Sequence, residues 1–129
     1  MLLTIALPLV VLSIDFAGVA VALPDIGEEF GIPSSDAVWV VNAFALGAAG
    51  PLLVAGRVSD RLGRRRCLRI GTAVFAVGTL CAAVAPTFGF LVAARAVQGA
   101  STAVFMTASL SIVSEVFGAD RRAWAIGMW

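Results

Sequence analysis

Two ionisable residues, Asp15 and Arg95, lie inside long apolar stretches of the chain. A charged side chain at the centre of a bilayer costs about 2.5 to 3.5 kcal/mol on insertion scales, so each of them needs a partner or a function. Asp15 stands nine residues before Pro24, and Arg95 stands nine residues after Pro86. If both prolines mark the same membrane surface, the helical rise places both charges about 13 Å below it. We therefore expect the two side chains to meet if their helices are neighbours.

Such a pair has two interpretations. It can be a buried ion pair that only fixes the register of two helices. Alternatively, Asp15 takes up a proton in one conformational state and releases it in another, because a nearby positive charge favours the carboxylate and desolvation favours the acid. The chain has no His and no Lys, so Asp15 is the best-placed proton carrier. Gln98 shares a helix face with Arg95 and could bind a substrate or the pair, although interhelical packing explains it equally well.

The composition places these residues in a membrane protein. The chain has 129 residues, of which 60% are hydrophobic and only 13% are charged, and its mean hydropathy is +1.01. Soluble domains carry about 25% charged residues and rarely show repeated apolar runs of about 20 residues. We therefore predict an all-α membrane protein, a multi-span helical bundle. Its two cysteines, Cys67 and Cys81, would be about 21 Å apart on one helix and are predicted to be free thiols.

The apolar runs predict four full spans and the start of a fifth, all within one partial bundle of residues 1–129. The spans are expected at about 2–23, 37–58, 68–85, 88–113 and 123–129. Small residues from Gly47 to Pro51 should allow close helix contact, and Pro51 should kink or open its helix. The third span is nearly featureless. Its packing positions are expected at Gly71, Thr72, Gly78 and Thr79.

The arginines predict the orientation. Six of the nine basic residues lie between Arg57 and Arg69, two more are Arg121 and Arg122, and the expected loop after Pro24 carries acids but no basic residue. Short arginine-rich loops stay on the cytoplasmic side of a membrane. We therefore expect a multi-pass protein of the cell membrane with a cytoplasmic N-terminus.

The arginine-rich loop has three interpretations. Asp60 can form a local ion pair with Arg61 or Arg64, which contributes little if it is exposed. It can instead belong to a charge relay that latches one half of a transporter against the other, with glycines that permit close approach and a tight turn. The arginines could also only anchor to anionic lipid headgroups. The residues expected to form the latch are Gly56, Asp60, Arg61, Gly63, Arg64 and Arg65.

Three stretches resemble known signatures. Residues 56–68, GRVSDRLGRRRCL, are similar to the GxLaDrxGrkxxl loop pattern of the major facilitator superfamily, and residues 95–103, RAVQGASTA, resemble its span-four pattern RxxqGxgaA. Residues 15–24, DFAGVAVALP, resemble the LDxTxxNxALP signature of the fourteen-span drug:proton antiporters, with Ala17 and Ala20 in place of Thr and Asn. The matching positions are Gly56, Asp60, Arg61, Gly63, Arg64, Arg65, Leu68, Arg95, Gln98, Gly99, Ala103, Asp15, Ala22, Leu23 and Pro24.

The resemblance implies a transporter of twelve or fourteen spans that works by alternating access. In that family the loop Asp and Arg contact the C-terminal half, and the span-four Arg is tied to proton coupling. The chain is then expected to be an N-terminal fragment, part of the N-terminal half of the fold, whose partners are the missing C-terminal half, the lipid bilayer and a small-molecule substrate. The leading hypothesis is efflux of drugs or other hydrophobic or cationic compounds, driven by a proton gradient without a cofactor or a metal.

Other functions stay open. The substitutions at Ala17 and Ala20 keep a metabolite or sugar carrier of the same superfamily as an alternative, and a small oligomeric membrane protein without transport activity is another. An enzyme is not expected, because the chain has no His, no cluster of metal ligands and no nucleophile elbow. Nucleic acid is not expected as a partner of so hydrophobic a chain.

Overall fold

The computed structural model describes residues 2–116 and 127, and these residues are almost entirely helical, without a strand. The helices are α1 (Leu2–Phe30), α2 (Ser34–Ala37), α3 (Trp39–Leu62), α4 (Arg64–Ala83) and α5 (Phe88–Val116). The segments long and apolar enough to cross a membrane are Leu9–Phe30, Ser34–Leu62, Arg64–Ala83 and Phe88–Val113. The predicted class, an all-α bundle with several candidate membrane spans, is confirmed. The expected fifth span, 123–129, lies outside the described residues apart from residue 127.

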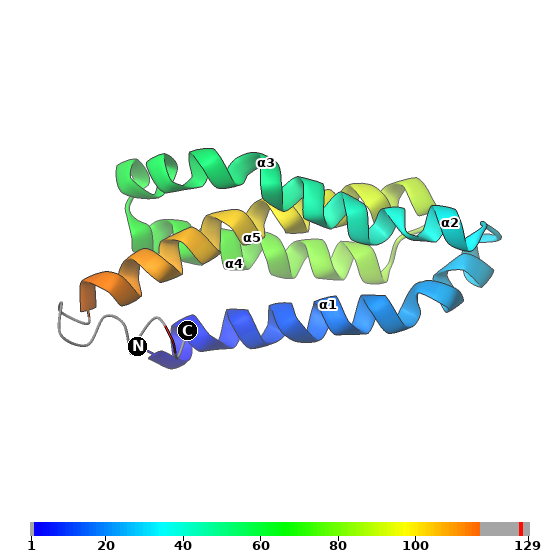
Figure 1. Ribbon diagram of the computed structural model, residues 1–129, viewed down its shortest axis with the longest axis horizontal. Coiled ribbons are helices and arrows are strands. Elements are labelled where there is room, and N and C mark those ends of the chain that lie inside the picture. The colour runs from blue at the N-terminus through cyan, green and yellow to red at the C-terminus, as the bar shows by residue number, and fades with distance from the viewer. Residues whose placement is uncertain (1, 117–126, 128–129) are drawn as a thin grey trace.

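The centre of the bundle is α5. It packs against both α3 and α4, whereas α1 touches the other long helices at few points. In Figure 1, α1 runs alongside the layer that the other three long helices form. The apolar core lies between α3, α4 and α5, where the rings of Phe75 and Phe105 pack edge to face with centroids 5.9 Å apart. The most polar of the expected spans therefore forms the most buried helix.

Helices α3 and α5 cross with their backbones in direct contact. A Cβ atom at Gly47 would overlap the backbone of Ala96, and a Cβ atom at Gly99 would overlap the carbonyl of Phe44. The expected close contact near Gly47 is thus confirmed, and small residues at such crossings let helix backbones approach. Pro51 lies inside α3, and Figure 1 shows this helix bending in the middle of its length, as a missing backbone N–H allows.

Helix α4 approaches α5 through two of the expected glycines. A Cβ atom at Gly71 would lie 2.9 Å from the Cβ of Phe105, and one at Gly78 would lie 2.6 Å from the Cγ of Gln98. Both positions therefore need glycine or a shift of the neighbour. The two cysteines on this helix are free thiols, as predicted.

The expected loop directly after Pro24 is wrong, because α1 continues to Phe30. A proline removes one backbone donor, so a helix can run on when its other hydrogen bonds hold. The helix ends instead at Gly31, whose φ is +61°. The N–H of Ile32 donates to the carbonyl of Gly27 at 2.9 Å, which completes a Schellman motif. The acids after Pro24 therefore sit on the last turns of a helix.

The expected arginine-rich loop is also wrong, because within residues 56–68 only Gly63 lies outside a helix. Arginine and leucine are good helix formers, so these residues do not interrupt a helix. Gly63 has a φ of +89°, which confirms the expected tight turn. Close approach at Gly56 is not confirmed, because a Cβ atom there would meet Thr107 at an ordinary 3.9 Å.

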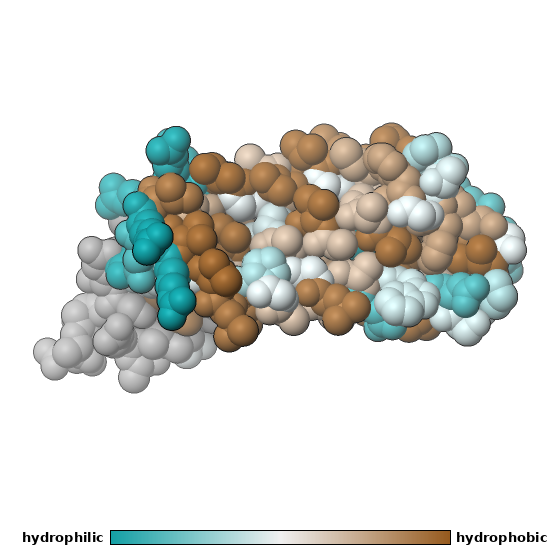
Figure 2. Space-filling model, turned by 90° about the horizontal axis from the view of Figure 1, so that it is seen from above, coloured by the Kyte–Doolittle hydropathy of each residue, from teal (hydrophilic) through white to brown (hydrophobic). Residues whose placement is uncertain are grey.

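Charged side chains gather at the two ends of the molecule. The end with the α3–α4 turn carries the exposed residues Arg57, Asp60, Arg61, Arg65, Arg66 and Arg69. The opposite end carries the exposed acids Asp25, Glu28, Glu29 and Asp36. Figure 2 shows hydrophilic residues at these ends and hydrophobic residues between them. This separation is the one that a membrane-spanning bundle requires.

Candidate functional site

Arg95 lies in the middle of the bundle with 1% of its surface exposed. Its Nη1 donates to Oδ2 of Asp15 at 2.6 Å and to Oε1 of Gln98 at 3.0 Å. Its Nε donates to the carbonyl of Val40 at 3.4 Å. Acceptors from α1, α3 and α5 thus converge on one guanidinium. The structure brings Asp15 and Arg95 together, as the comparison of their depths predicted.

The ring of Phe44 forms one side of this site. The guanidinium carbon of Arg95 lies 4.6 Å from the ring centroid, a cation–π contact worth about 2 kcal/mol when it is desolvated. The same ring packs edge-on against Phe16 of α1, with centroids 6.4 Å apart. Sequence reasoning missed this role, although Phe44 is the one aromatic residue of α3 beyond its first turn.

The site extends to α4 through Gln98, which is fully buried. Its Nε2 donates to the hydroxyl oxygen of Thr79 at 2.8 Å, and the Thr79 hydroxyl donates to the carbonyl of Phe75 at 3.0 Å. We call the side chains of Asp15, Arg95, Gln98 and Thr79 the polar network. Sequence reasoning placed Thr79 only as a packing position. The available signal was a hydroxyl in the apolar part of α4, where Thr72 carries the other one.

The ion pair is the electrostatic centre of this network. The side chain of Asp15 is 12% exposed and that of Arg95 is 2% exposed, so neither charge is screened well by water. Removing one partner of a buried pair costs about 3 to 5 kcal/mol, because the other charge stays buried. Within the described residues, Nη2 of Arg95 has no hydrogen-bond partner. A further acceptor beside this nitrogen would therefore be bound favourably.

The network allows a simple proton-dependent change. A carboxylate accepts a stronger hydrogen bond from a guanidinium than a neutral carboxylic acid does. If Asp15 took up a proton, Arg95 would keep its contacts with Gln98 and with the carbonyl of Val40. Protonation would thus weaken the polar contact between α1 and α5 and leave Arg95 with two neutral hydrogen-bond acceptors.

The predicted latch residues lie at the α3–α4 turn, away from the polar network. Nη2 of Arg64 pairs with Oδ1 of Asp60 at 3.5 Å, and Nη1 of Arg64 donates to the carbonyl of Ser111 at 3.5 Å. Asp60, Arg61 and Arg65 are exposed, and exposed ion pairs contribute roughly 0 to 1 kcal/mol. The latch itself stays a prediction.

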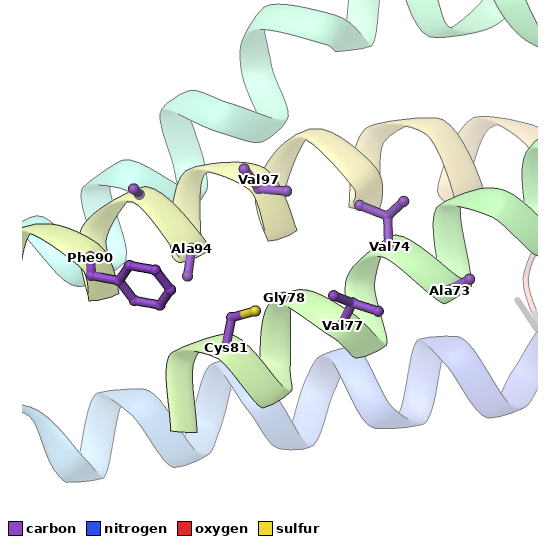
Figure 3. Close-up of a pocket in the computed structure, with 9 residues that line it drawn as sticks. Ala73, Val74, Val77, Gly78, Cys81, Phe90, Ala94 and Val97 are labelled. Carbon is purple, nitrogen blue, oxygen red and sulfur yellow. The ribbon is translucent and has the colours of Figure 1, made fainter. Parts of the chain in front are cut away.

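An apolar pocket of about 440 Å³ lies between α4 and α5. Figure 3 shows Val77 and Cys81 of α4 and Phe90, Ala94 and Val97 of α5 around it. No side chain of the polar network lines this pocket. Among the residues that the structure describes, no group of three or more His, Cys, Asp and Glu could hold a metal ion.

Comparison with known proteins extends these findings. A family model described as Major Facilitator Superfamily matches residues 5–129. The chain is 41% identical over 126 residues to "Multidrug efflux pump LfrA" of Mycolicibacterium smegmatis, covering 97% of this chain and 25% of that protein. It is 36% identical over 129 residues to "Multidrug resistance protein Stp" of Mycobacterium tuberculosis, covering 99% of this chain and 24% of that protein. A "Methylenomycin A resistance protein" of Streptomyces coelicolor is 36% identical over 121 residues, with 93% of this chain and 26% of that protein covered. The chain spans about a quarter of the length of these relatives.

Proposed function

The chain belongs to the major facilitator superfamily, and we propose that it acts within a proton-coupled efflux transporter for drugs or other hydrophobic or cationic small molecules. Relatives that cover almost all of this chain carry names of multidrug efflux and antibiotic resistance proteins, which supports efflux over uptake. The observation that carries the proposal is the buried ion pair between Asp15 and Arg95, with its 2.6 Å contact. A buried acid beside a buried arginine is the arrangement in which proton uptake changes an interhelical contact.

In this proposal the pair is a proton-dependent link between α1 and α5. When Asp15 is ionised, its carboxylate holds Arg95 and thereby holds α1 against the bundle. When Asp15 takes up a proton, Arg95 relies on Gln98 and on the carbonyl of Val40, and α1 is released to move. Proton binding and helix movement are thereby coupled, because each state of Asp15 favours one position of α1.

The packing of α1 supports its role as the moving element. Almost all described side chains in its candidate span are exposed or only partly buried, and α1 has few contacts with α3 and α5. Apolar helices in lipid gain little from the hydrophobic effect when they associate. A displacement of α1 therefore exposes little surface that was covered, and the ion pair is the main polar contact that it breaks.

We further propose a place in the cell for this transporter. The arginine-rich end, with Arg57 to Arg69, would face the cytoplasm together with the N-terminal end of α1, in a multi-pass protein of the cell membrane. Because the relatives are about four times longer than this chain, we propose that the C-terminal half of the same transporter completes the substrate path. The latch residues around Asp60 would contact that half.

The proposal is tested by Asp15→Asn in the full-length gene product, with efflux of a fluorescent cationic dye measured in membrane vesicles under an imposed pH gradient. Asparagine keeps the shape of aspartate but cannot take up and release a proton, so gradient-driven efflux should fall to the background of empty vesicles. The matched control is Asp25→Asn on the same helix, which removes an exposed acid and should leave efflux unchanged.

The loss of a charge partner could also unfold the protein. Asp15→Glu therefore accompanies the test, because it keeps an ionisable acid beside Arg95 and should retain measurable coupling. Membrane-inserted protein is quantified for each variant. Gradient-driven efflux at the wild-type rate in Asp15→Asn would show that Asp15 is not the coupling acid.

A further inference from the structure

We propose that Thr79 of α4 is a positioning residue of the coupling site, which sets the orientation of the Gln98 amide and thereby the place of Arg95. This role rests on the proposed function, because the site couples proton movement to transport only if that proposal holds. Its structural content rests on the two hydrogen bonds of Thr79, at 2.8 Å to Gln98 and at 3.0 Å to Phe75.

The direction of these hydrogen bonds fixes the amide. A threonine hydroxyl has one proton to donate, and Thr79 donates it to the carbonyl of Phe75 one turn earlier in its own helix. Toward Gln98, Thr79 can then only accept, so the NH₂ group of the amide must face it. The amide oxygen consequently faces Nη1 of Arg95, at 3.0 Å. If the amide were flipped, its NH₂ group would face Nη1 of Arg95, and two hydrogen-bond donors would oppose each other.

Helix α4 also makes room for this arrangement. Gln98 is fully buried, and a Cβ atom at Gly78 would lie 2.6 Å from its Cγ. Gly78 thus leaves space for the stem of the glutamine, and the next residue, Thr79, binds its amide. Because Gln98 is sealed from solvent, water does not substitute for the threonine hydroxyl when it is removed.

The consequence reaches the ion pair because Nη1 of Arg95 donates to both Asp15 and Gln98. The groups that surround Arg95 are Asp15 from α1, the Val40 carbonyl and the Phe44 ring from α3, and Gln98 from α5, which the Thr79 hydroxyl of α4 holds in turn. Cys81 is the titratable residue of α4 that lies nearest to Thr79 in the sequence. Its side chain lines the apolar pocket. Of the two acceptors that Arg95 keeps when Asp15 is neutral, the amide oxygen of Gln98 is therefore held in place by Thr79.

The test compares Thr79→Val with Thr79→Ser in the full-length gene product. Valine matches threonine in shape but has no hydroxyl, whereas serine keeps the hydroxyl. The first readout does not depend on transport: the side-chain amide signal of Gln98 in ¹⁵N-glutamine-labelled protein, assigned by its loss in Gln98→Leu. We expect Thr79→Val to shift or broaden this signal, Thr79→Ser to leave it in place, and Thr72→Val on the same helix to leave it unchanged.

The second readout is gradient-driven dye efflux. We expect Thr79→Val to lower its rate about threefold to twentyfold, the factor that corresponds to the free energy of one hydrogen bond between membrane helices, and Thr79→Ser to keep the wild-type rate. An unchanged Gln98 signal in Thr79→Val would overturn the inference. A shifted signal with wild-type efflux would overturn the link to coupling. If the wild-type protein shows no gradient-driven efflux, the proposed function fails, and the amide signal still decides whether Thr79 orients Gln98.

Discussion

Replacing Gly47 by alanine should destabilise the protein, while the same change at Gly50, three residues later on the same helix, should not. A Cβ atom at Gly47 would overlap the backbone of Ala96, whereas a Cβ atom at Gly50 would meet no atom within 4 Å. Overpacking costs about 1 to 3 kcal/mol, and the upper end applies at Gly47 because a backbone cannot rotate away as a side chain can. Alanine gains about 1 kcal/mol over glycine inside a helix. The expected changes in unfolding free energy are therefore about 2 kcal/mol of destabilisation at Gly47 and up to about 1 kcal/mol of stabilisation at Gly50.

The assay is denaturant or thermal unfolding of the purified full-length protein in one detergent, with both variants measured beside the wild type. Gly99→Ala serves as a reciprocal change, because its Cβ would overlap the Phe44 carbonyl from the opposite helix. It should be destabilised in the same direction as Gly47→Ala. Equal stability of Gly47→Ala and Gly50→Ala would refute the crossing of α3 and α5 at this point.

Two further predictions concern single positions. Arg95→Lys should lower gradient-driven efflux at least about tenfold with normal membrane insertion, because one ammonium cannot reproduce the geometry by which the guanidinium reaches three acceptors. Efflux at the wild-type rate in this variant would show that a positive charge alone is sufficient at this position. Gly63→Ala should destabilise the protein by about 1 to 2 kcal/mol in thermal unfolding, because its φ of +89° is strained for a residue with a Cβ atom. Gly89→Ala, at a position with no neighbouring atom within 4 Å, is its control, and equal stability of the two variants would contradict the turn geometry.

The meeting of Asp15 and Arg95 could be predicted because membrane thickness links sequence distance to depth. Two charges at equal depth in neighbouring helices have few other partners, so counting residues from Pro24 and Pro86 indicated the pair, although α1 continues past Pro24 and the sequence did not show which helices are neighbours. The ends of the helices could not be predicted in the same way. Leaving the hydrocarbon does not end a helix, and residues 25–30 and the arginines of residues 56–68 stay helical. Positive-φ glycines, Gly31 and Gly63, lie where α1 and α3 stop.

The contacts that Phe44 and Thr79 make at the site could not be predicted from the sequence, for a different reason. Each depends on how a helix is rotated about its axis and on which neighbour it faces. The rotation is set by the glycine contacts, such as those of Gly47 and Gly78, which become visible only when two helices are placed together. An apolar helix in lipid shows no strong amphipathic pattern that would reveal its inward face. Polar partners of buried residues are therefore harder to predict than the buried charges themselves.

The attachment of α1 follows from these contacts. Besides the ion pair, α1 meets the bundle through two ring contacts, Phe16 with Phe44 at 6.4 Å and Phe30 with Phe88 at 6.1 Å, and through Leu9 and Leu12, which pack against the apolar core. These apolar contacts do not depend on the charge of Asp15, so proton uptake would weaken the polar contact in the middle of α1 and leave the apolar contacts on both sides of it in place. Release of Asp15 would therefore loosen α1 without detaching it from the bundle, because the apolar contacts of Leu9, Leu12 and Phe30 remain.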